Sequence, residues 1–285
     1  MAATTDVPAR ALIINADDFG LSEGINCGIL EGHRAGAITS TSIMVGMPAF
    51  ADAVHLARAA PALGVGLHFT LTAGKPLTAA PSLIDEHTGN FLGVSALVRR
   101  ALVGRVRPRE VEGECAAQIA VAREAGVGLT HLDGHHHIHL LPGVRAAVRR
   151  VVAAERIPAV RRPNERVFGG IARRRLPERA LVGAFAHYVD SRKWGVATTN
   201  HFVGSALLGA SDFHSLLLRV LDSLPGGITE LMVHPGHVTA PLPGNDAYTT
   251  QRETELQALM SPDVRARLRR GDIRLLSYGQ IRDAR

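Results

Sequence analysis

The sequence predicts an α/β protein whose strands pair mainly in parallel. Short apolar segments of strand length alternate with segments of helix length along the 285 residues, and this alternation is typical of parallel sheets. Polar side chains of the kinds that bind metals or transfer protons follow four of the predicted strands. The sequence contains no repeat, low-complexity tract or linker, so we expect a single domain over residues 1–285.

The first predicted elements are a strand and a helix. Residues 11–16 are almost continuously apolar, as expected of a strand that is buried on both faces. Ser22 can cap the N-terminus of a helix over residues 24–35, because its hydroxyl can accept a hydrogen bond from a free backbone amide. Gly36 can end that helix in a left-handed conformation.

Two further strands enclose the second predicted helix. Residues 39–45 are rich in β-branched side chains and predict a strand, and Pro61 ends a helix over residues 49–60. Residues 65–72 predict another strand. The segment 73–90 is rich in Pro, Gly and Thr and is too long for a simple connection, which indicates a functional loop.

The middle of the chain is predicted to contain three helices and a short strand. Residues 95–102 and 110–125 have helical patterns, and residues 129–132 resemble a strand that leads into a histidine cluster. Pro142 and Gly143 precede a helix over residues 144–155. Residues 156–200 mix short strand-like and arginine-rich helical patterns without a clear period.

The last third of the chain returns to a regular alternation. The predicted helices cover residues 211–224, 251–260 and 262–270, and the predicted strands cover residues 229–233 and 273–277.

The composition excludes several classes of protein. Hydrophobic residues make up 46% of the chain and charged residues 20%, which excludes wholesale disorder. Cys27 and Cys115 are too few for a disulfide framework or a cysteine-rich zinc site, and both are interpreted as structural. No nucleotide-binding glycine motif, serine-hydrolase motif, signal sequence or apolar run of membrane length is present. We therefore expect a cytoplasmic protein that does not bind a membrane.

The charge is basic, but its pattern does not favour nucleic acid as a partner. The formal net charge is +6, and almost all of the positive charge is arginine, since Lys75 and Lys193 are the only lysines. Aromatic residues make up only 4%, so basic and stacking side chains do not alternate as they do in single-strand binders. The more unusual feature is the presence of 14 histidines.

Three of the four polar clusters are short. Asp17 and Asp18 directly follow the first strand, where adjacent carboxylates repel each other unless a cation or a proton lies between them; a simple turn is the alternative. Such a pair can give one carboxylate to a metal and leave the other as a general base. His68 lies in the third strand and could equally be a satisfied core residue. His234 and His237 follow the strand at 229–233, where a histidine can act as a general acid.

The strongest signal is the run from Thr130 to His139, THLDGHHHIH. If this run is extended, its period of two places His131, Asp133, His135, His137 and His139 on one face. Neutral imidazoles bind zinc and similar ions, and a nearby carboxylate can orient them. Five such groups exceed the needs of one ion, so we expect one or two ligands, with the others in acid–base or orienting roles.

Taken together, these motifs resemble the YdjC-like carbohydrate deacetylases, and among them the chitooligosaccharide deacetylases. The resemblance is carried by NADDFGLS at residues 15–22, GLHFTLTAGKPL at residues 66–77, the histidine run at residues 130–139 and the pair His234-Pro235. These motifs occur in the family's order and span most of the chain. Residues 156–200 contain no motif of the family.

The resemblance implies a distorted (β/α) barrel and a divalent metal ion, magnesium or zinc. It assigns the metal to Asp18, His68 and His135 and the role of catalytic base to Asp17. Gly134 stands where the family usually has serine, so the local geometry can differ while every ligand-type residue remains. His131, Asp133, His137, His139 and His237 are expected to contact substrate or to orient the ligands.

The implied activity is metal-dependent hydrolysis of an N-acetyl group on an amino sugar or chitooligosaccharide, which releases acetate. Asp17 would take a proton from water, and His234, His137 or His139 would give one to the leaving amine. The alternatives are a deacetylase of the related hopanoid-biosynthesis branch and a metallohydrolase of phosphoesters or cyclic amides. The expected partner is an acetylated sugar rather than nucleic acid or membrane, and a homodimer is compatible with the sequence.

Overall fold

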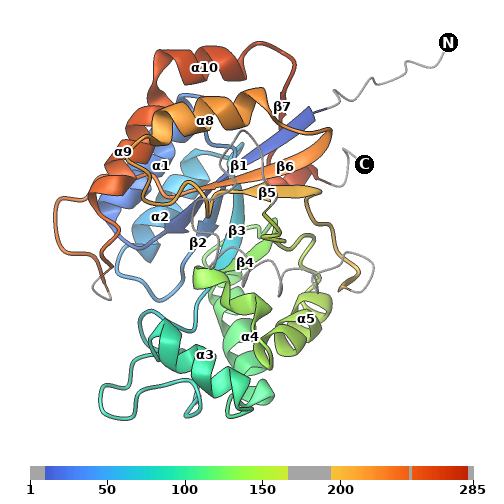
Figure 1. Ribbon diagram of the computed structural model, residues 1–285. Coiled ribbons are helices and arrows are strands. Elements are labelled where there is room, and N and C mark those ends of the chain that lie inside the picture. The colour runs from blue at the N-terminus through green and yellow to red at the C-terminus, as the bar shows by residue number, and fades with distance from the viewer. Residues whose placement is uncertain (1–9, 166–193, 244–245, 282–285) are drawn as a thin grey trace.

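The computed structural model describes residues 10–165, 194–243 and 246–281, and it confirms the predicted fold class. A parallel sheet curls into a half-barrel with helices along its outer side (Figure 1). Every pairing between named strands is parallel. The strand order is β4-β3-β2-β1-β6-β5, and β7 pairs with the start of β1. The strands are β1 (Arg10–Phe19), β2 (Ser40–Ile43), β3 (Gly64–Phe69), β4 (Leu132–Gly134), β5 (His201–Val203), β6 (Gly227–Val233) and β7 (Arg274–Leu275).

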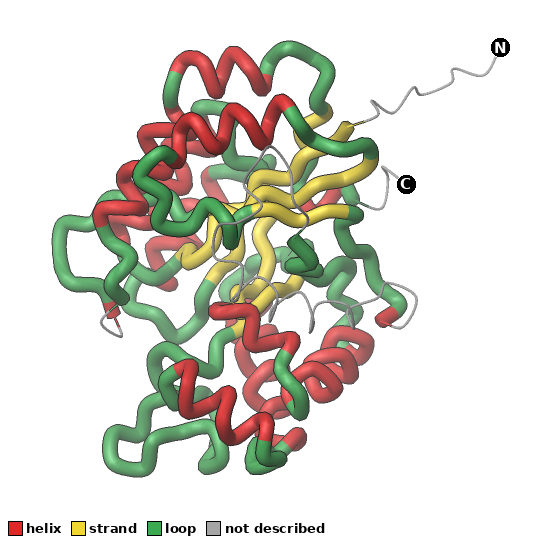
Figure 2. The backbone as a smooth tube through the Cα atoms, viewed as in Figure 1, coloured by secondary structure: helices red, strands yellow, loops and turns green. Residues whose placement is uncertain are grey.

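Helices connect successive strands, as a parallel sheet requires, and Figure 2 shows them around the curled strands. Helices α3 to α5 lie at one end of the molecule, whereas α8, α9 and α10 lie together on another side (Figure 1). The α-helices are α1 (Glu23–Arg34), α2 (Phe50–Ala59), α3 (Val94–Leu102), α4 (Pro108–Glu124), α5 (Val144–Ala154), α8 (Phe213–Asp222), α9 (Thr250–Met260) and α10 (Pro262–Leu268). Two short 3-10 helices are η1 (His135–Leu140) and η3 (Tyr278–Gln280).

The local signals for α1 are confirmed. The Ser22 hydroxyl accepts a hydrogen bond from the backbone N–H of Ile25 at 3.3 Å, so it caps the helix as predicted. Gly36 follows the helix with φ = 78°, a conformation that glycine adopts at little cost.

Several predicted strand boundaries are corrected by the structure. Strand β1 extends through Asp17 and Asp18 to Phe19, and β3 ends three residues before the predicted limit of residue 72. Strand β4 lies at residues 132–134 instead of 129–132. Strand β5 was not predicted, because three residues are too few to show a period. Within the segment 156–200, residues 166–193 lie outside the described residues.

Strands β4 and β5 are at the two ends of the strand order, and no continuous ladder joins them within the described residues. Isolated β-bridges through residues 158–165 connect the two instead. They pair Leu132 with Val160, Ala159 with Ala197, and Glu165 with Phe202. We call residues 158–165 the seam. The backbone N–H of Val160 donates to the carbonyl of Ala197, and that of Arg161 donates to the carbonyl of Leu132, at 3.0 Å each. The seam therefore curls the sheet toward closure and carries the Arg161 side chain inward.

The central strand β1 alternates between two apolar environments. Leu12 and Ile14 belong to the large core beneath the helices, whereas Ala11 and Ile13 contact a smaller group inside the curl that includes Tyr278. Because side chains of a strand alternate with a period of two, Asp17 continues the inward-facing set. Hydrophobic patterning of β1 thus places a carboxylate inside the half-barrel at the end of the strand.

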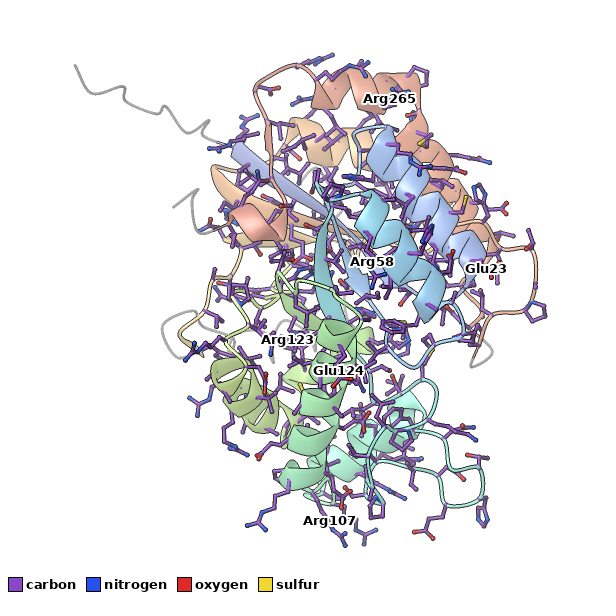
Figure 3. The ribbon with its side chains drawn as sticks, turned by 180° about the vertical axis from the view of Figure 1, so that it is seen from behind. Glu23, Arg58, Arg107, Arg123, Glu124 and Arg265 are labelled. Atoms are coloured by element: carbon purple, nitrogen blue, oxygen red, sulfur yellow. The ribbon has the colours of Figure 1, made fainter. Side chains whose placement is uncertain are left out.

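Many of the basic side chains lie on the surface, on several different elements. Arg58, Arg107, Arg123 and Arg265 project from α2, from the residue before α4, from the end of α4 and from α10 (Figure 3). Two of these arginines, Arg107 and Arg123, form exposed ion pairs with Glu110 and Glu155. Among the described residues, no helix has the length and apolar character needed to cross a membrane.

Candidate active site

A pocket of about 310 Å³ opens at the carboxyl ends of β1, β3, β4 and β6. This is the end of a parallel barrel at which active sites are found. A second hollow, of about 520 Å³, lies near the start of β3 and is lined mostly by apolar residues and glycines, so the chemistry points to the first pocket. The first pocket is lined by Asp17, Asp18, His68, Gly134, His135, His136, His137, Ser205, Leu208, Met232, His234, Asp246, Tyr248 and Arg252.

An irregularity in β1 turns two adjacent carboxylates toward this pocket. In a regular strand, Asp17 and Asp18 would point to opposite faces. The register between β1 and β2 shifts between Ala16 and Phe19, and Asp18 has φ = 69°, a conformation that non-glycine residues rarely adopt. Such backbone strain costs on the order of 1–3 kcal/mol and is concentrated at functional sites.

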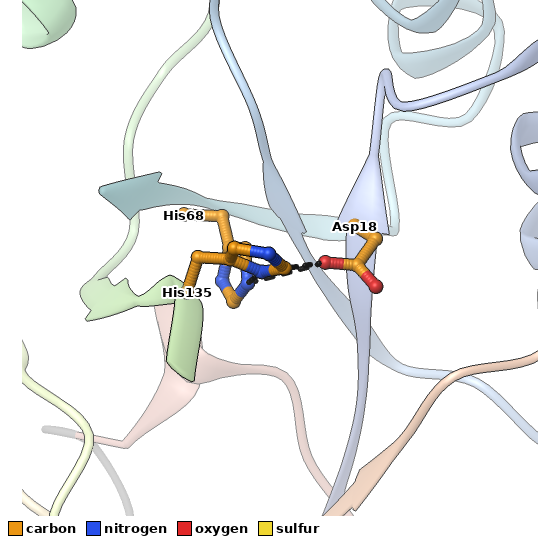
Figure 4. A group of neighbouring side chains, drawn as sticks. All are labelled: Asp18, His68 and His135. Atoms are coloured by element: carbon orange, nitrogen blue, oxygen red, sulfur yellow. Dashed lines mark hydrogen bonds and ion pairs between the residues drawn. The ribbon is translucent and has the colours of Figure 1, made fainter. Parts of the chain in front are cut away.

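Asp18, His68 and His135 present three donor atoms to one point (Figure 4). Asp18 Oδ1 lies 3.3 Å from His68 Nε2 and 3.2 Å from His135 Nδ1, and the two nitrogens are 3.2 Å apart. Donors about 2.1 Å from one divalent ion stand roughly 3.0–3.4 Å apart in octahedral or tetrahedral geometry. The triangle therefore fits a divalent metal ion, and we call these three residues the inner cluster.

The carboxylate of Asp133 fixes the orientation of His68. The Nδ1–H of His68 donates to Asp133 Oδ1 at 2.6 Å, which leaves Nε2 as the ligand atom. The Ser42 hydroxyl donates to Asp133 Oδ2, also at 2.6 Å. Metal-binding histidines commonly have such a carboxylate behind them. Asp133 therefore lies where it can orient His68.

Arg252 occupies the second oxygen of Asp18. Its Nη2 donates to Asp18 Oδ2 and to Asp246 Oδ2, at 2.7 Å each, and its side chain is buried. Burial alone would raise the pKa of Asp18, but Arg252 and the two histidines of the inner cluster lower it well below its usual value. Asp18 is thus ionised, and its Oδ1 accepts no regular hydrogen bond from any described residue. That oxygen is left for a cation.

Arg161 has the corresponding role beneath Asp17. Its Nη1 and Nη2 donate to both oxygens of Asp17 at 2.6 Å each, and its Nε donates to Glu230 at 2.8 Å. Its Nη2 also lies 2.9 Å from Asp133. Asp17, His68 and Asp133 are close enough to hold an ion themselves, but the guanidinium of Arg161 already forms ion pairs with both carboxylates. Asp17 is therefore held in one orientation beside the inner cluster.

The carboxylates around the inner cluster favour a positive charge at that position. Burial alone would lower the pKa of His68, but the carboxylates of Asp133 and Asp17 raise it to about 10. The same carboxylates are buried in a medium where charges interact strongly. A divalent cation at the inner cluster would offset the negative charge of these carboxylates, and it would bind His68 in its neutral form.

The histidine run is not extended, in contrast to the predicted alternation. After β4 ends at Gly134, the chain forms η1, with φ = 54° at His136 and 55° at His137. A side chain at Gly134 would come within 2.8 Å of the His139 ring, so the missing side chain permits this tight fold. The predicted common face therefore ends at Gly134. His131 and Asp133 both reach the Ser42 hydroxyl, whereas His135, His137 and His139 lie on the folded segment.

Only part of the run reaches the pocket. His135 and His137 line it, whereas His139 is buried and its Nε2–H donates to the carbonyl of Arg161 at 3.2 Å. His131 is buried below and stacks on Tyr278 with ring centres 3.9 Å apart. Burial lowers the pKa of His131 to about 3 and that of His139 to about 4, so both are neutral. These two histidines support the site from below.

His234 and His237 lie in different parts of the structure. His234 lines the pocket, and its Nε2 lies 3.9 Å from Asp17 Oδ2. The side chain of His237 lies instead beside α1, where its Nε2 is 3.1 Å from Glu31 Oε2. The structure does not bring His237 to the pocket.

Sequence reasoning missed several residues that shape the site. Arg161, Arg252 and Glu230 are buried charged residues, and Tyr248 lines the pocket while its hydroxyl donates to Glu255. Arg161 was visible only as part of an arginine pair, and the others lie in segments without a recognisable motif. A buried charged partner has no signature in one sequence, because its burial depends on contacts between distant segments.

Comparison with known proteins identifies the family of this chain. The family model described as YdjC-like protein matches residues 11–270. The chain belongs to the YdjC-like family. Proteins named carbohydrate deacetylase are similar to it over 95% of its length. They come from Brevibacillus brevis (34% identity, 99% of that protein covered), Geobacillus stearothermophilus (36%, 98%) and Vibrio cholerae (33%, 96%).

A solved structure supports the fold of this YdjC-like protein. A crystal structure from Enterococcus faecalis V583, of a protein named for cellobiose-phosphate cleavage, superposes with a TM-score of 0.78 at 27% identity. The match covers 94% of this chain and 97% of the other. The half-barrel and its helices are therefore shared over nearly the whole length.

Proposed function

We propose that this YdjC-like protein is a metal-dependent hydrolase that removes the N-acetyl group of an amino sugar or chitooligosaccharide and releases acetate. The observation that carries the proposal is the inner cluster with Asp17 directly beside it at the end of the barrel. The names of the similar proteins support carbohydrate deacetylation.

Asp18, His68 and His135 would hold the divalent ion, either magnesium or zinc. Such an ion, when bound, polarises a carbonyl oxygen and lowers the pKa of a bound water. Arg252 keeps Asp18 Oδ1 directed at that position by occupying Oδ2. Asp133 keeps His68 Nε2 directed there by accepting the proton of Nδ1.

Asp17 is the candidate general base. Its two oxygens are fixed by Arg161, and the Asn15 amide donates to Oδ1 at 2.9 Å. Oδ2 is the oxygen nearer to His234, so it is the one we assign to accept a proton from the attacking water. Asp17 does not need to move for this step, because Arg161 has already oriented it.

His234 is the candidate general acid. Among the three histidines considered for this role, His139 is occupied below the pocket, whereas His137 and His234 line it. His234 Nε2 lies on the Asp17 side of the pocket, so a substrate bound against both residues would meet a base and an acid. We assign His234 to give a proton to the departing amine, and His137 to contact the sugar.

The test is mass spectrometry of products from a panel of compounds, with and without a chelator. Diacetylchitobiose and other N-acetylated sugars should lose an acetyl group, and chelation should stop the reaction. Acetylated lipid-linked sugars represent the hopanoid-type alternative, and phosphoesters and cyclic amides represent the other metallohydrolases. Cleavage of a phosphoester or cyclic amide without acetate release from any sugar would overturn the proposal.

Asp17→Asn tests the assignment of the base. Loss of a general base lowers turnover by about 10²–10⁴-fold. Metal content should stay unchanged, since Asp17 is not in the inner cluster. Asp263→Asn is the matched control, because Asp263 is exposed and does not line the pocket. Within the described residues, its ion pair is with His214, which is also exposed. Undiminished turnover in Asp17→Asn would remove Asp17 from this role.

A further inference from the structure

We propose that Cys27, Glu31 and His237 form a second metal site, on the outer surface of the protein, suited to Zn²⁺. Cys27 and Glu31 are one turn apart on α1, so their side chains lie on the same face of the helix. His237 reaches this face from the segment after β6. The three ligand atoms lie within 4.8 Å of one another, and we call these residues the outer cluster.

The distances in the outer cluster suit a shared ion. Cys27 Sγ is 3.3 Å from Glu31 Oε1, and Glu31 Oε2 is 3.1 Å from His237 Nε2. With zinc–ligand bonds of about 2.0–2.3 Å, tetrahedral ligands stand roughly 3.3–3.7 Å apart. Small rotations of exposed side chains would therefore bring all three donors to one zinc ion. Their partial exposure leaves the fourth position to water.

Backbone packing builds the outer cluster from two distant segments. A side chain at Gly24 would come within 2.3 Å of the His237 carbonyl oxygen, and one at Gly28 within 2.7 Å of the Gly236 Cα. The two glycines thus let the 236–237 backbone lie directly on α1. The backbone N–H of His237 also donates to the carbonyl of Gly24 at 3.1 Å. His237 is consequently held above Cys27 and Glu31 by fixed backbone.

The donor set selects the kind of metal. A thiolate, an imidazole and a carboxylate together suit zinc, whereas magnesium prefers oxygen ligands alone. In the absence of a metal, the Cys27 thiol donates a hydrogen bond to the Glu31 carboxylate. Zinc binding forms the Zn–S bond as this S–H proton leaves to solvent, and the ion then replaces the two hydrogen bonds to Glu31.

Zinc at the outer cluster would connect α1 to the segment that carries His234. His237 is three residues beyond His234, and the intervening Gly236 donates from its N–H to the carbonyl of Arg252 at 3.2 Å. The outer cluster therefore lies behind the pocket and not in it. A bound ion would stabilise this wall of the pocket and add to the stability of the whole chain.

Cobalt(II) provides a probe that separates the two clusters. Binding of Co²⁺ to a thiolate gives a sulfur-to-metal charge-transfer band, and the inner cluster contains no sulfur. The full chain should show this band, and Cys27→Ser should lack it. Asp18→Asn should keep it, because the outer cluster does not depend on the inner one or on deacetylase activity. Equal spectra of the full chain and Cys27→Ser would overturn the proposal.

Equilibrium dialysis against Zn²⁺ provides the second measurement. Cys27→Ser and His237→Asn should each bind one zinc ion fewer than the unaltered chain, or bind it at least about tenfold more weakly. His214→Asn is the matched control, since His214 also forms an exposed pair with a carboxylate, Asp263, but without a cysteine in the pair. Circular dichroism would verify folding of each variant. Unchanged zinc binding in both outer-cluster variants would refute the site.

Discussion

The inner and outer clusters use similar donors in opposite settings. His68 and Asp18 are almost completely buried, and Asp133 and Arg252 hold them from behind. In the outer cluster, the side chains of His237 and Glu31 are 42% and 40% exposed. Burial makes the inner donors rigid and their charges strongly interacting, whereas water screens the outer ones. The difference indicates that the residues behind the donors, more than the donors themselves, determine how rigidly a cluster is held.

The largest effect is expected from Asp18→Asn, which removes the only carboxylate of the inner cluster. We expect metal binding at this cluster to be lost and turnover to fall about a thousandfold or more, because metal-ion catalysis supplies several kcal/mol. Metal analysis of the dialysed protein and acetate release measure the two effects. Full activity in this variant would place the metal elsewhere.

Arg161→Met tests what the buried arginine contributes beneath the inner cluster. It leaves Asp17, Asp133 and Glu230 without their shared cation, and breaking a buried ion pair costs about 3–5 kcal/mol. Urea denaturation measures this loss. Arg123→Met, at the exposed pair with Glu155, should cost less than about 1 kcal/mol. Similar losses in both variants would contradict the contrast between buried and exposed pairs.

Acidic pH should destabilise the protein through its buried histidines. The pKa of His139 is lowered from 6.5 to about 4, so between these values the unfolded chain binds more protons than the folded one. Its contribution to stability is complete above pH 6.5 and declines as the pH falls toward 4, by on the order of 3 kcal/mol. His139→Gln keeps an N–H donor but does not titrate, so its stability should depend less on pH over this range.

Denaturation of both proteins at several pH values measures this difference. His214→Gln, an exposed position, should retain the acid-side loss that His139 causes. A wild-type pH profile in His139→Gln would show that His139 does not cause the loss.

Asp133→Asn should weaken metal binding at the inner cluster without abolishing it. Asp133 touches His68 but is not in the donor triangle, and loss of such an orienting partner costs about 10–100-fold in affinity. Isothermal titration with magnesium, or with zinc in the Cys27→Ser background where the outer cluster is removed, gives the change. An affinity equal to that of the unaltered chain would mean that the imidazole is oriented without the Asp133 charge.

The smallest effect is expected from Glu31→Gln in the outer cluster. Without added zinc, the free energy of unfolding should change by less than about 1 kcal/mol, because the ion pair with His237 is exposed. Urea denaturation in chelator measures this value. A loss as large as that of Arg161→Met would show that the outer cluster is structural even without a metal.

The sequence predicted what depends on local pattern. The apolar run of β1, the Ser22 cap and the position of polar residues at strand ends all follow from short-range rules. The resemblance to a family then selected Asp18, His68 and His135, and the structure brings these three together. Their convergence follows from parallel strands that end at the same edge of a sheet.

What the sequence did not predict depends on contacts between distant segments. Arg161 lies 144 residues from Asp17, and Arg252 lies 234 residues from Asp18. The fold of the histidine run depends on the space at Gly134, which a period of two cannot reveal. Both cysteines were interpreted as structural, but Cys27 is exposed and only Cys115 is buried. The two cysteines lie on different helices, α1 and α4, and which of them is buried depends on what packs against each helix.

The seam has a consequence for heat inactivation. Arg161, which orients the candidate base, extends from a segment held by single bridges, whereas Asp17 directly follows the part of β1 that pairs residue by residue with β6. Segments with few backbone hydrogen bonds open before the whole protein unfolds. Warming would therefore separate Arg161 from Asp17 while the remaining sheet is intact, and activity would decline below the melting temperature. Amide hydrogens of Val160 and Arg161 would exchange with solvent sooner than those of Ile13 and Ile14.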